Sequence, residues 1–357
     1  MRQVSNLRIA SMTPLDSADD FVAKLPITEE IAELVATSRE QIGRIIRGED
    51  DRMLVVVGPC SIHDEKAGLE YAQRLAELKR RVEDRIMIVM RVYFEKPRTT
   101  VGWKGFINDP HLNGSFDVPT GLFRARKFIL DVLSLGLPTA IEWLDPVTPQ
   151  YLADIICLGF IGARTVESQT HRQLASGLSM PIGFKSGTGG TGHSIQIAVD
   201  ALVAARAEHT ILSVLGNGRV GVAQTTGNPD TLVVLRGGVQ GPNCTPPHVA
   251  DAVARLEKAG LPPYLMVDCS HGNSGKDHRN QPIVFASVIE QRAAGNRHVV
   301  AVMLESHLFE GNQKLNGDAS GLKYGVSITD ACVGLETTEQ LLLGAHSRLR
   351  ATERAGV

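Results

Sequence analysis

Short runs of apolar and mostly branched residues recur along the chain, and each has about the length of one strand. They are bounded by polar or glycine-rich segments. Continuous apolar runs of this length are typical of parallel strands, because both faces of such strands are buried. We predict eight strands, at residues 53–57, 86–92, 139–144, 161–164, 181–185, 231–236, 264–269 and 299–304.

Each predicted strand is followed by a segment in which apolar residues return every three or four positions. In the first of these segments, Leu69, Ala72 and Leu75 fall largely on one face of a helix. Another segment starts at Thr148 and Pro149, which suit the N-cap and the first helical position. We predict eight helices, at residues 67–81, 121–133, 149–157, 168–178, 194–205, 247–259, 281–293 and 338–349.

Eight alternating β and α units predict an α/β fold of the (β/α)8 TIM barrel type. A doubly wound open sheet is the alternative, but eight is the number of strands that closes a barrel. We assign residues 46–357 to the barrel and residues 1–45 to an N-terminal extension. The extension is predicted to hold a short strand at 7–10 and an amphipathic helix at 28–47, with Thr28 as its N-cap.

One segment between the fifth helix and the sixth strand breaks the alternation. Residues 209–230 read as a strand, a Gly-Asn-Gly turn and a second strand. A tight turn between two short apolar runs is typical of a β-hairpin. We therefore predict a hairpin inserted into the barrel at about residues 209–226.

The composition of the 357 residues argues against several classes of protein. With 43% hydrophobic and 21% charged residues, the chain is globular rather than disordered. Its formal charge of −2 argues against a nucleic-acid partner, which would select a basic excess. No apolar run reaches the roughly 18 residues that span a bilayer, and the N-terminus lacks a signal peptide's apolar core. We expect a cytoplasmic protein with no membrane partner, and the five widely spaced cysteines indicate no disulfide framework.

The predicted strand ends carry most of the unusual residues, and a barrel has its chemistry at the carboxyl ends of its strands. Six of these residues are cations, more than the neighbouring acids can pair. A structural role would pair each cation with one carboxylate, but the surplus favours an anionic ligand such as a phosphate. The cations are Arg91, Lys96, Arg98, Arg164, Lys185 and Arg236, and the acids are Glu95, Glu142, Asp268 and Glu305. Glycines at 187–190 and 237–238 would let such a ligand approach backbone N–H groups.

A second set at the strand ends mixes a thiol, an imidazole and carboxylates. Together such groups can bind a divalent transition metal. The set comprises Cys60, His271, Glu305 and Asp330. Cys269, His63 and His307 are rival ligands, and composition alone favours purely structural roles for Cys60 and His271.

The two lysines at strand ends leave a further chemistry open. Lys96 or Lys185, if buried, could form a Schiff base with a carbonyl substrate. The residue pattern does not exclude such an aldolase, which would need no metal. Borohydride trapping with substrate would reveal a Schiff base, whereas sensitivity to a chelator would support the metal.

Seven stretches of the chain, taken in order, resemble the class I 3-deoxy-D-arabino-heptulosonate-7-phosphate (DAHP) synthases. The resemblance covers nearly the whole chain, and its motifs are long and ordered. They are GPCS at 58–61, RVYFEKPRTT at 91–100, GARTVES at 162–168, GFK at 183–185, LRGG at 235–238, DCSHGN at 268–273 and SITD at 327–330. The stretch after Lys185 departs from the family, because it is glycine-richer and lacks the usual aspartate.

The resemblance implies a metal-dependent transferase at the first step of the shikimate pathway, which leads to chorismate and the aromatic amino acids. Phosphoenolpyruvate would condense with D-erythrose 4-phosphate and water, giving DAHP and inorganic phosphate. The cofactor would be one divalent ion per subunit, either Mn²⁺, Fe²⁺, Co²⁺ or Zn²⁺. The matching motifs imply that Cys60, His271, Glu305 and Asp330 are its ligands, in preference to Cys269.

The same motifs imply how the two substrates would be held. Phosphoenolpyruvate would contact Arg91, Lys96, Arg164, Lys185 and Arg236. Erythrose 4-phosphate would contact Lys96, Pro97, Arg98 and Thr99. Lys96 would protonate or position the nascent alkoxide, and Glu142 would order the attacking water. The Lys-Pro-Arg-Thr stretch argues against the related synthase that uses arabinose 5-phosphate, and the intact site residues argue against a non-catalytic effector-binding barrel.

The family also carries regulatory additions on its barrel, and the N-terminal extension and the hairpin fit them. An aromatic amino acid would bind between the hairpin, the nearby helices and the N-terminus of a neighbouring subunit, in a homodimer or homotetramer. The pocket would comprise Asn6, Pro149, Gln150, Leu174, Leu178, Ser179, Ile211, Ser213 and Ala223. Ser213 favours phenylalanine or tryptophan and Asn6 favours tyrosine, so the identity of the effector stays open.

Overall fold

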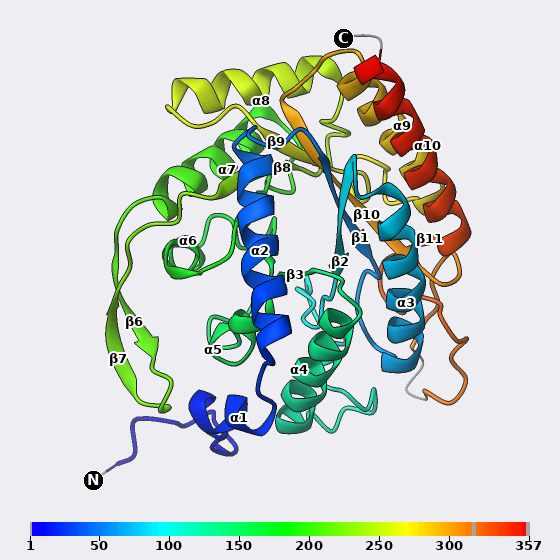
Figure 1. The fold of residues 1–357 in the computed structure, drawn as a ribbon. Helices are drawn as coiled ribbons and strands as arrows, with labels where there is room; N and C mark the ends of the chain where they lie inside the picture. The colour runs from blue at the N-terminus through cyan, green and yellow to red at the C-terminus, as the bar shows by residue number, and fades with distance from the viewer. Residues whose placement is uncertain (1, 316–318, 355–357) are drawn as a thin grey trace.

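Eight parallel strands close into a barrel with helices around its outside (Figure 1). The structure is a computed structural model that describes residues 2–315 and 319–354. The barrel strands are β1 (Met53–Gly58), β2 (Ile86–Arg91), β3 (Thr139–Glu142), β4 (Leu158–Ile161), β5 (Ile182–Lys185), β8 (Thr231–Leu235), β9 (Leu265–Asp268) and β10 (Val299–His307). Every residue of these strands is buried, as expected for strands with side chains inside the barrel on one face and helices on the other.

The barrel closes because β1 pairs in parallel with two strands that lie far apart in the sequence. Leu54 is opposite Met87 of β2 on one side and opposite Ala301 of β10 on the other. An open doubly wound sheet would leave β1 or β10 with an unpaired edge. The pairing confirms the (β/α)8 barrel and excludes the open sheet.

The helices that follow the strands lie close to their predicted positions, with one exception. They are α3 (Glu65–Val82), α4 (Val118–Ser134), α5 (Pro149–Leu152), α6 (Gln169–Gly177), α7 (Gly192–Ala205), α8 (Pro246–Lys258), α9 (Gln281–Ala293) and α10 (Leu335–Arg354). The exception is α5, a single turn followed by the 3-10 helix η1 (Ala153–Ile155). Thr148 does not cap it, because the Thr148 hydroxyl contacts Glu95 and a backbone carbonyl instead.

The fourth strand lies at Leu158–Ile161, which corrects the prediction of residues 161–164. The chain is apolar without interruption from Ile155 to Ile161, so periodicity could not show where the helix ends and the strand begins. The pairing of Gly159 with both Ile141 and Ile182 sets the position of the strand. Tertiary contacts therefore decided this boundary.

Helix α2 (Glu29–Ile46) closes the amino end of the barrel and lies across the strands in Figure 1. The Thr28 side chain accepts a hydrogen bond from the N–H of Ile31, which confirms the predicted N-cap. Ile42 and Ile45 are fully buried in the same core as the strands. Arg39 donates to the Ile156 carbonyl just before β4, at 3.0 and 2.8 Å. The helix is thus part of the barrel core, although the proposed division at residue 45 remains a prediction.

The rest of the N-terminal segment is mostly exposed and contains helix α1 (Ala18–Lys24). The expected strand at residues 7–10 is wrong: the structure has no strand there. Leu7 and Ile9 are 67% and 51% exposed, and no strand pairs with them within the described residues. A short apolar run alone cannot form a strand without a partner.

The predicted hairpin is present as β6 (Thr210–Val214) and β7 (Val220–Gln224), which form their own antiparallel sheet at one side of the molecule (Figure 1). Ile211 is opposite Ala223, and Ser213 is opposite Gly221. A two-residue strand that was not predicted, β11 (Val333–Gly334), extends the sheet beside the end of β10. Over the described residues, no helix is both long enough and apolar enough to span a membrane.

Candidate active site at the carboxyl end of the barrel

The six predicted cations line one cavity of about 270 Å³ at the carboxyl ends of the strands. The same cavity is lined by Glu142, His271, Glu305 and Asp330. Pro97 and Thr99 of the loop after β2 complete its rim. Residues from widely separated parts of the chain therefore meet in a space of the size of a small metabolite.

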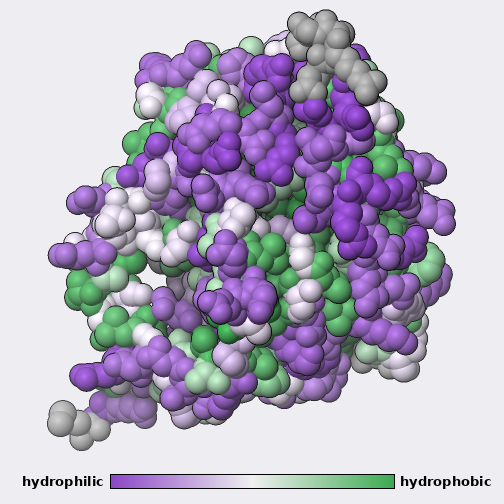
Figure 2. Space-filling model, in the orientation of Figure 1, coloured by the Kyte–Doolittle hydropathy of each residue, from purple (hydrophilic) through white to green (hydrophobic). Residues whose placement is uncertain are grey.

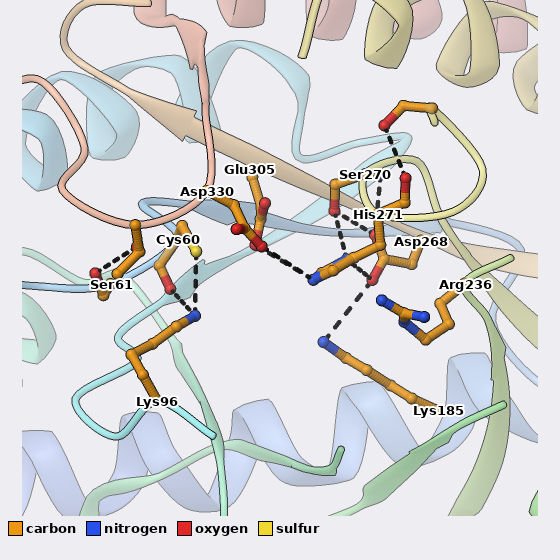
Figure 3. Close-up of polar contacts among 12 residues, drawn as sticks. Cys60, Ser61, Lys96, Lys185, Arg236, Asp268, Ser270, His271, Glu305 and Asp330 are labelled. Carbon is orange, nitrogen blue, oxygen red and sulfur yellow. Dashed lines mark hydrogen bonds and ion pairs between the residues drawn. The ribbon is translucent and has the colours of Figure 1, made fainter. Parts of the chain in front are cut away.

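The predicted metal ligands converge beside this cavity (Figure 3). The Cys60 sulfur and carboxylate oxygens of Glu305 and Asp330 all lie within 4.8 Å of one another. His271 Nε2 lies 3.8 Å from Glu305 Oε1 and 4.0 Å from Asp330 Oδ2. Ligands that sit about 2.0–2.3 Å from one ion are separated by no more than about 4.6 Å, so donors this close need only a small adjustment to bind one ion. One thiol, one imidazole and two carboxylates are also donors that divalent transition metals accept.

The rival ligands are not part of this cluster of donors. Cys269 Sγ lies 4.0 Å from the Val267 carbonyl oxygen. His307 Nδ1 accepts a hydrogen bond from the backbone N–H of Leu308. Among the described residues, the group of close metal donors consists of Cys60, Glu305 and Asp330, so Cys60 is its cysteine.

A carboxylate behind His271 fixes the orientation of its ring. His271 Nδ1 lies 2.9 Å from Asp268 Oδ2 and 3.0 Å from the Ser270 hydroxyl, so Nε2 is the nitrogen that faces Glu305 and Asp330. Burial opposes the charge on Asp268, but His271, Lys185 and Ser270 outweigh burial and keep the pKa of Asp268 far below its usual range. An ionised partner on Nδ1 leaves Nε2 as an acceptor, which is the usual support for a metal-binding histidine.

Lys96 and Cys60 are in direct contact. The Lys96 ammonium donates to the Cys60 carbonyl oxygen at 3.0 Å and to its sulfur at 3.1 Å. Burial and the nearby Glu305 raise the pKa of the Cys60 thiol to about 11. Burial also opposes the charge on Lys96, but the Cys60 sulfur and the carboxylates of Glu305 and Glu142 raise its pKa above the ordinary value. Lys96 is therefore protonated at neutral pH, which disfavours a Schiff base at this lysine.

The deeper cations each have an acidic partner. Arg91 is fully buried, and its Nη2 lies 3.1 Å from Glu305 Oε1. Lys185 Nζ lies 3.3 Å from Glu142 Oε2 and 3.8 Å from Asp268 Oδ2. Burial opposes ionisation of Glu142, but Lys185 and Lys96 outweigh it and lower the pKa of Glu142. Glu142 is therefore ionised in this arrangement.

The outer cations have no carboxylate partner within the part of the chain that the structure describes. Arg164 donates to the Thr99 hydroxyl at 3.3 Å, and Arg236 donates to the carbonyl of Gly237 at 3.2 Å. Arg236 is only 7% exposed, so its positive charge is largely desolvated. Arg164 is exposed, but a buried cation without an acidic partner, as Arg236 is, favours an anionic ligand.

Two residues at this site escaped the sequence interpretation. The Tyr93 ring centroid lies 4.0 Å from Arg91 and 5.6–5.9 Å from Lys185 and Lys96, and Tyr93 is 2% exposed. Tyr93 follows Arg91 by two positions. Side chains two positions apart in an extended chain point to the same face, so the sequence could have placed Tyr93 beside Arg91. Lys276 also lines the cavity, but it belongs to a turn after β9 where no periodic pattern points to it.

The glycines of the rim serve close packing between loops. A side chain on Gly238 would overlap the backbone of Thr188 and Gly190, and one on Gly272 would overlap Gly238. Val239 N–H donates to the Thr188 carbonyl at 2.9 Å. The loops after β5, β8 and β9 can pack together only because these positions are glycines. This packing is a structural alternative to the expectation that the glycines open the backbone to a ligand.

Most of the residues expected to bind an effector surround the space between the hairpin and the barrel. Ile211, Ser213 and Ala223 are among the half-buried residues of β6 and β7, where they alternate with exposed ones. Gln150 Nε2 lies 3.5 Å from the Ser213 hydroxyl. Figure 2 shows an opening here, where Figure 1 has the hairpin beside α5 and α6.

The remaining members of that set divide into two groups. Leu174 lies in α6, and Leu178 and Ser179 follow it. A cavity of about 580 Å³ is lined by Pro149, Gln150 and Ser179 together with residues of α1 and α2. Asn6 lies in the exposed segment before α1, and no hydrogen bond joins it to the others among the described residues. The effector role of these residues remains a prediction.

Comparisons with known proteins agree on one relationship. The sequence model of the DAHP synthetase I family matches residues 25–343. The chain is 50% identical over 354 residues to the Escherichia coli K12 "Phospho-2-dehydro-3-deoxyheptonate aldolase, Tyr-sensitive", covering 99% of this chain and 98% of that one. It is 52% identical over 349 residues to the Phe-sensitive protein of the same organism, covering 98% of each. The solved structure of the Francisella tularensis SCHU S4 aldolase of this name superposes with a TM-score of 0.93 at 47% identity, covering 96% and 99%.

Proposed function

The chain belongs to the DAHP synthetase I family, and from this premise we propose how the residues of its barrel rim carry out the family reaction. The enzyme condenses phosphoenolpyruvate with D-erythrose 4-phosphate and water, and it releases DAHP and inorganic phosphate. This is the first step of the shikimate pathway. One observation supports the assignment of the site: six cations line one cavity with a cluster of metal donors beside it, and the substrates bring two phosphates and a carboxylate.

Phosphoenolpyruvate binds to Arg91, Lys96, Arg164, Lys185 and Arg236 in this proposal. Arg164 and Arg236 lack carboxylate partners in the described structure, so they are free to pair with the phosphate through planar guanidinium groups. Arg91 and Lys185 are already balanced by Glu305 and Glu142, so they hold the substrate with less change in local charge. We therefore expect phosphate binding to depend more strongly on Arg164 and Arg236 than on Arg91 and Lys185.

Erythrose 4-phosphate binds to the loop that begins at Lys96. Pro97, Arg98 and Thr99 lie on the rim of the cavity, and Arg98 and Thr99 are exposed. Thr99 is held toward the phosphoenolpyruvate residues by its contact with Arg164. The two substrates would therefore meet with the aldehyde directed inward, toward Lys96.

In this proposal Cys60, His271, Glu305 and Asp330 hold a single divalent metal ion, which DAHP synthases generally need. The close grouping of Cys60, Glu305 and Asp330, with His271 beside the two carboxylates, supports it. Such an ion, when bound, supplies Lewis acidity that polarises the aldehyde carbonyl. Asp268 holds the His271 ring in the orientation that this binding requires. Mn²⁺, Fe²⁺, Co²⁺ and Zn²⁺ all accept this donor set, and we propose one ion per subunit without choosing among them.

Lys96 and Glu142 move the protons of the reaction in this proposal. When C3 of phosphoenolpyruvate attacks the aldehyde carbon, the aldehyde oxygen gains negative charge, and the protonated Lys96 ammonium can donate to it. Positive charge develops at C2, and a water molecule adds there. The ionised Glu142 can accept the proton of that water, after which phosphate leaves by cleavage of its C–O bond.

An aromatic amino acid inhibits the enzyme in this proposal, since the relatives named above are Tyr-sensitive and Phe-sensitive. Pro149, Gln150 and Ser179 line one cavity, Gln150 contacts Ser213 of the hairpin, and Asn6 would come from a neighbouring subunit. The Gln150–Ser213 contact already joins α5 to the hairpin. We propose a homodimer or homotetramer in which the pocket is completed by the partner.

Phosphate release tests the proposed function directly. The purified enzyme should release phosphate from phosphoenolpyruvate only when an aldose phosphate is present, and erythrose 4-phosphate should outperform arabinose 5-phosphate and ribose 5-phosphate. A chelator should abolish the release, and an added divalent ion should restore it. Phosphate release that persists after chelation, together with borohydride trapping on a lysine, would instead establish Schiff-base chemistry.

A further inference from the structure

Glu95 has surroundings that do not suit a carboxylate. It lies between the substrate-binding residues Arg91 and Arg98 in sequence, but its side chain is only 4% exposed. Its carboxyl oxygen Oε2 lies 3.1 Å from the Thr148 hydroxyl. The charged group near it is another acid, the exposed Asp145, and burial outweighs the backbone N–H groups of Leu144 and Asp145, which favour the ionised form. No cation is paired with it within the described chain.

The hydrogen atoms available at Thr148 indicate which form of Glu95 is present. The Thr148 hydroxyl oxygen lies 3.1 Å from Glu95 Oε2 and 2.9 Å from the Asp145 carbonyl oxygen. A hydroxyl has one hydrogen, and a carbonyl oxygen can only accept it. If Glu95 were ionised, two acceptors would compete for that hydrogen. If Glu95 is neutral, its O–H donates to Thr148 and the Thr148 O–H donates to Asp145, so every group is satisfied.

Thr148 stands at a helix start, and its side chain is diverted from the usual role there. It is the N-cap residue of α5, but it makes no capping hydrogen bond. The helix is correspondingly short, with one α turn. Thr148 therefore uses its hydroxyl to contact Glu95 in preference to capping α5.

Besides the contacts of Lys96 with Cys60 and of Thr99 with Arg164, the loop that follows Glu95 has few other anchors. Lys96 N–H donates to the Lys104 carbonyl at 2.9 Å and closes its base, and the Trp103 ring N–H donates to the Asp109 carbonyl at 3.0 Å. Between these contacts the chain is exposed, with Val101 at 90%. Arg98 and Thr99 lie in this exposed part, so their positions depend on how the base is held.

We propose that Glu95 is a neutral carboxylic acid that anchors the aldose-phosphate loop to the start of α5 through Thr148. This inference rests on the proposed function, because it assigns the loop to erythrose 4-phosphate. Glu95 is then a positioning residue: it acts through Arg98 and Thr99 and does not contact the substrate itself. The link between β2 and α5 sets how far the loop stands from the cavity.

Burial and the neighbouring Asp145 raise the pKa of Glu95 to about 8, which agrees with the neutral form. Glu95 therefore keeps its proton below about pH 8 and loses it above. Ionisation would remove the donor to Thr148 and leave two negative charges side by side. The other titratable group packed here is His171, whose ring contacts the Leu144 carbonyl at 2.8 Å. Anchoring of the loop should therefore weaken as the pH rises through about 8.

Infrared difference spectroscopy tests the protonation state without using activity. The wild-type protein should show the carbonyl stretch of a neutral carboxylic acid that disappears with a midpoint near pH 8, and Glu95→Gln should lack it. Asp145→Asn should move the midpoint to lower pH, because it removes the neighbouring charge. An absent band at pH 7 in the wild type, relative to Glu95→Gln, would overturn the proposal even if the enzyme makes no DAHP.

Steady-state kinetics test the positioning role. Thr148→Val should raise the KM for erythrose 4-phosphate by roughly two- to tenfold, the effect of one neutral hydrogen bond, with little change in the KM for phosphoenolpyruvate. Thr148→Ser keeps the hydroxyl and is the matched control. Glu95→Met should resemble Thr148→Val, whereas Glu95→Gln, whose amide can donate as the acid does, should rescue the low KM and remove its rise above pH 8.

Amide hydrogen exchange measures how firmly the loop is held, independently of the kinetic assay. Peptides covering residues 96–104 should exchange faster in Glu95→Met and Thr148→Val than in Glu95→Gln and Thr148→Ser. Equal exchange and equal KM values in all four variants would overturn the anchor. If wild-type enzyme does not use erythrose 4-phosphate at all, the proposed function fails, but the exchange and infrared measurements still decide the state of Glu95.

Discussion

Cys60 illustrates how a single side chain at this rim depends on its neighbours. Its thiol is fully buried, and burial together with Glu305 keeps it protonated at neutral pH, with a pKa of about 11. A cysteine binds a metal as the thiolate, so metal binding must release this proton. The affinity for metal should therefore fall as the pH falls.

We predict that EDTA abolishes activity and that a divalent ion such as Mn²⁺ restores it. Cys60→Ala should bind the ion at least tenfold more weakly, because it removes one of four proposed ligands. Metal content and isothermal titration measure the affinity, and circular dichroism should show an intact fold. Cys269→Ala is the matched control, since that cysteine is equally buried but outside the donor group. A fully active Cys60→Ala enzyme with normal metal content would contradict the assignment.

Arg98 and Arg236 should affect different substrates. Arg98→Ala should raise the KM for erythrose 4-phosphate more than the KM for phosphoenolpyruvate, and Arg236→Ala should do the reverse. A hydrogen bond to a charged group contributes about 1.5–3 kcal/mol, or roughly ten- to a hundredfold in KM. Lys127→Ala, on the surface of α4, is a charge control. Equal effects of each arginine on both substrates would argue against two separate phosphate sites.

Among the elements, α2 has a structural role at the end of the barrel opposite the cavity. Its cap at Thr28 and its apolar face are local features, but its burial depends on the open amino end of the strands. Arg39 ties the helix to the segment before β4. The helix therefore stabilises the barrel without reaching the substrates.

Ile42→Ala should lower the free energy of unfolding by about 2–5 kcal/mol, because it leaves a cavity among fully buried residues. The KM values at a permissive temperature should stay close to wild type. Chemical denaturation measures the stability, with Glu40→Ala on the exposed face of the same helix as control. A loss of substrate affinity in a stably folded Ile42→Ala enzyme would show that α2 is coupled to the cavity.

The hairpin is the second structural element outside the repeating pattern, and it lies beside α5 and α6 (Figure 1). Alternation along β6 directs Ile211 and Ser213 to one face and Leu212 to the other, and Leu212 is 78% exposed. Only a hairpin held beside α5 and α6 gives the inner residues a pocket to line. The position of the hairpin is thus set by its contact with the barrel helices.

Ser179→Phe should desensitise the enzyme to its aromatic inhibitor, because the added ring would fill the space beside Pro149 and Gln150. Neither substrate's KM should change much, since Ser179 does not line the catalytic cavity. Inhibition curves with phenylalanine, tyrosine and tryptophan measure the effect, and Ser179→Ala is the control of similar size. Inhibition at the wild-type concentration in Ser179→Phe would place the effector elsewhere.

At the scale of the whole molecule, the two ends of the barrel have different tasks. The amino end is covered by α2, while the carboxyl end is open to the substrates. Several exposed apolar side chains lie on the N-terminal segment and on the outer face of the hairpin. They are Val4, Leu7, Met12, Leu212, Val220 and Val222. A surface of this kind favours burial against another subunit.

Deleting residues 1–15 should leave turnover largely intact and remove inhibition by whichever aromatic amino acid acts on the full-length enzyme. The segment is exposed and has few contacts within its own chain, so the barrel should fold without it. Light scattering should report the oligomeric state of both proteins beside the inhibition curves. Retained inhibition in a stable truncated enzyme would show that the N-terminus is not part of the effector site.

The sequence by itself determined the repeating unit of this protein and the chemistry of its strand ends. Buried strands and one-sided helices follow from local periodicity, and Thr28 caps its helix as its neighbours predict. The excess of cations after the strands indicated an anionic ligand before any fold was known. These features could be predicted because each depends on residues within a few positions of one another.

Only the tertiary structure decided which of these residues meet and in which state. Cys60 and Asp330 lie at opposite ends of the sequence, and closure of β1 on β10 is what brings their loops together. The neutral form of Glu95 depends on Thr148, 53 positions away, and on desolvation that no local pattern reports. The cations around Tyr93 also come from separate strands. Distances, desolvation and charge balance are properties of the closed barrel, so the sequence pattern alone could not determine them.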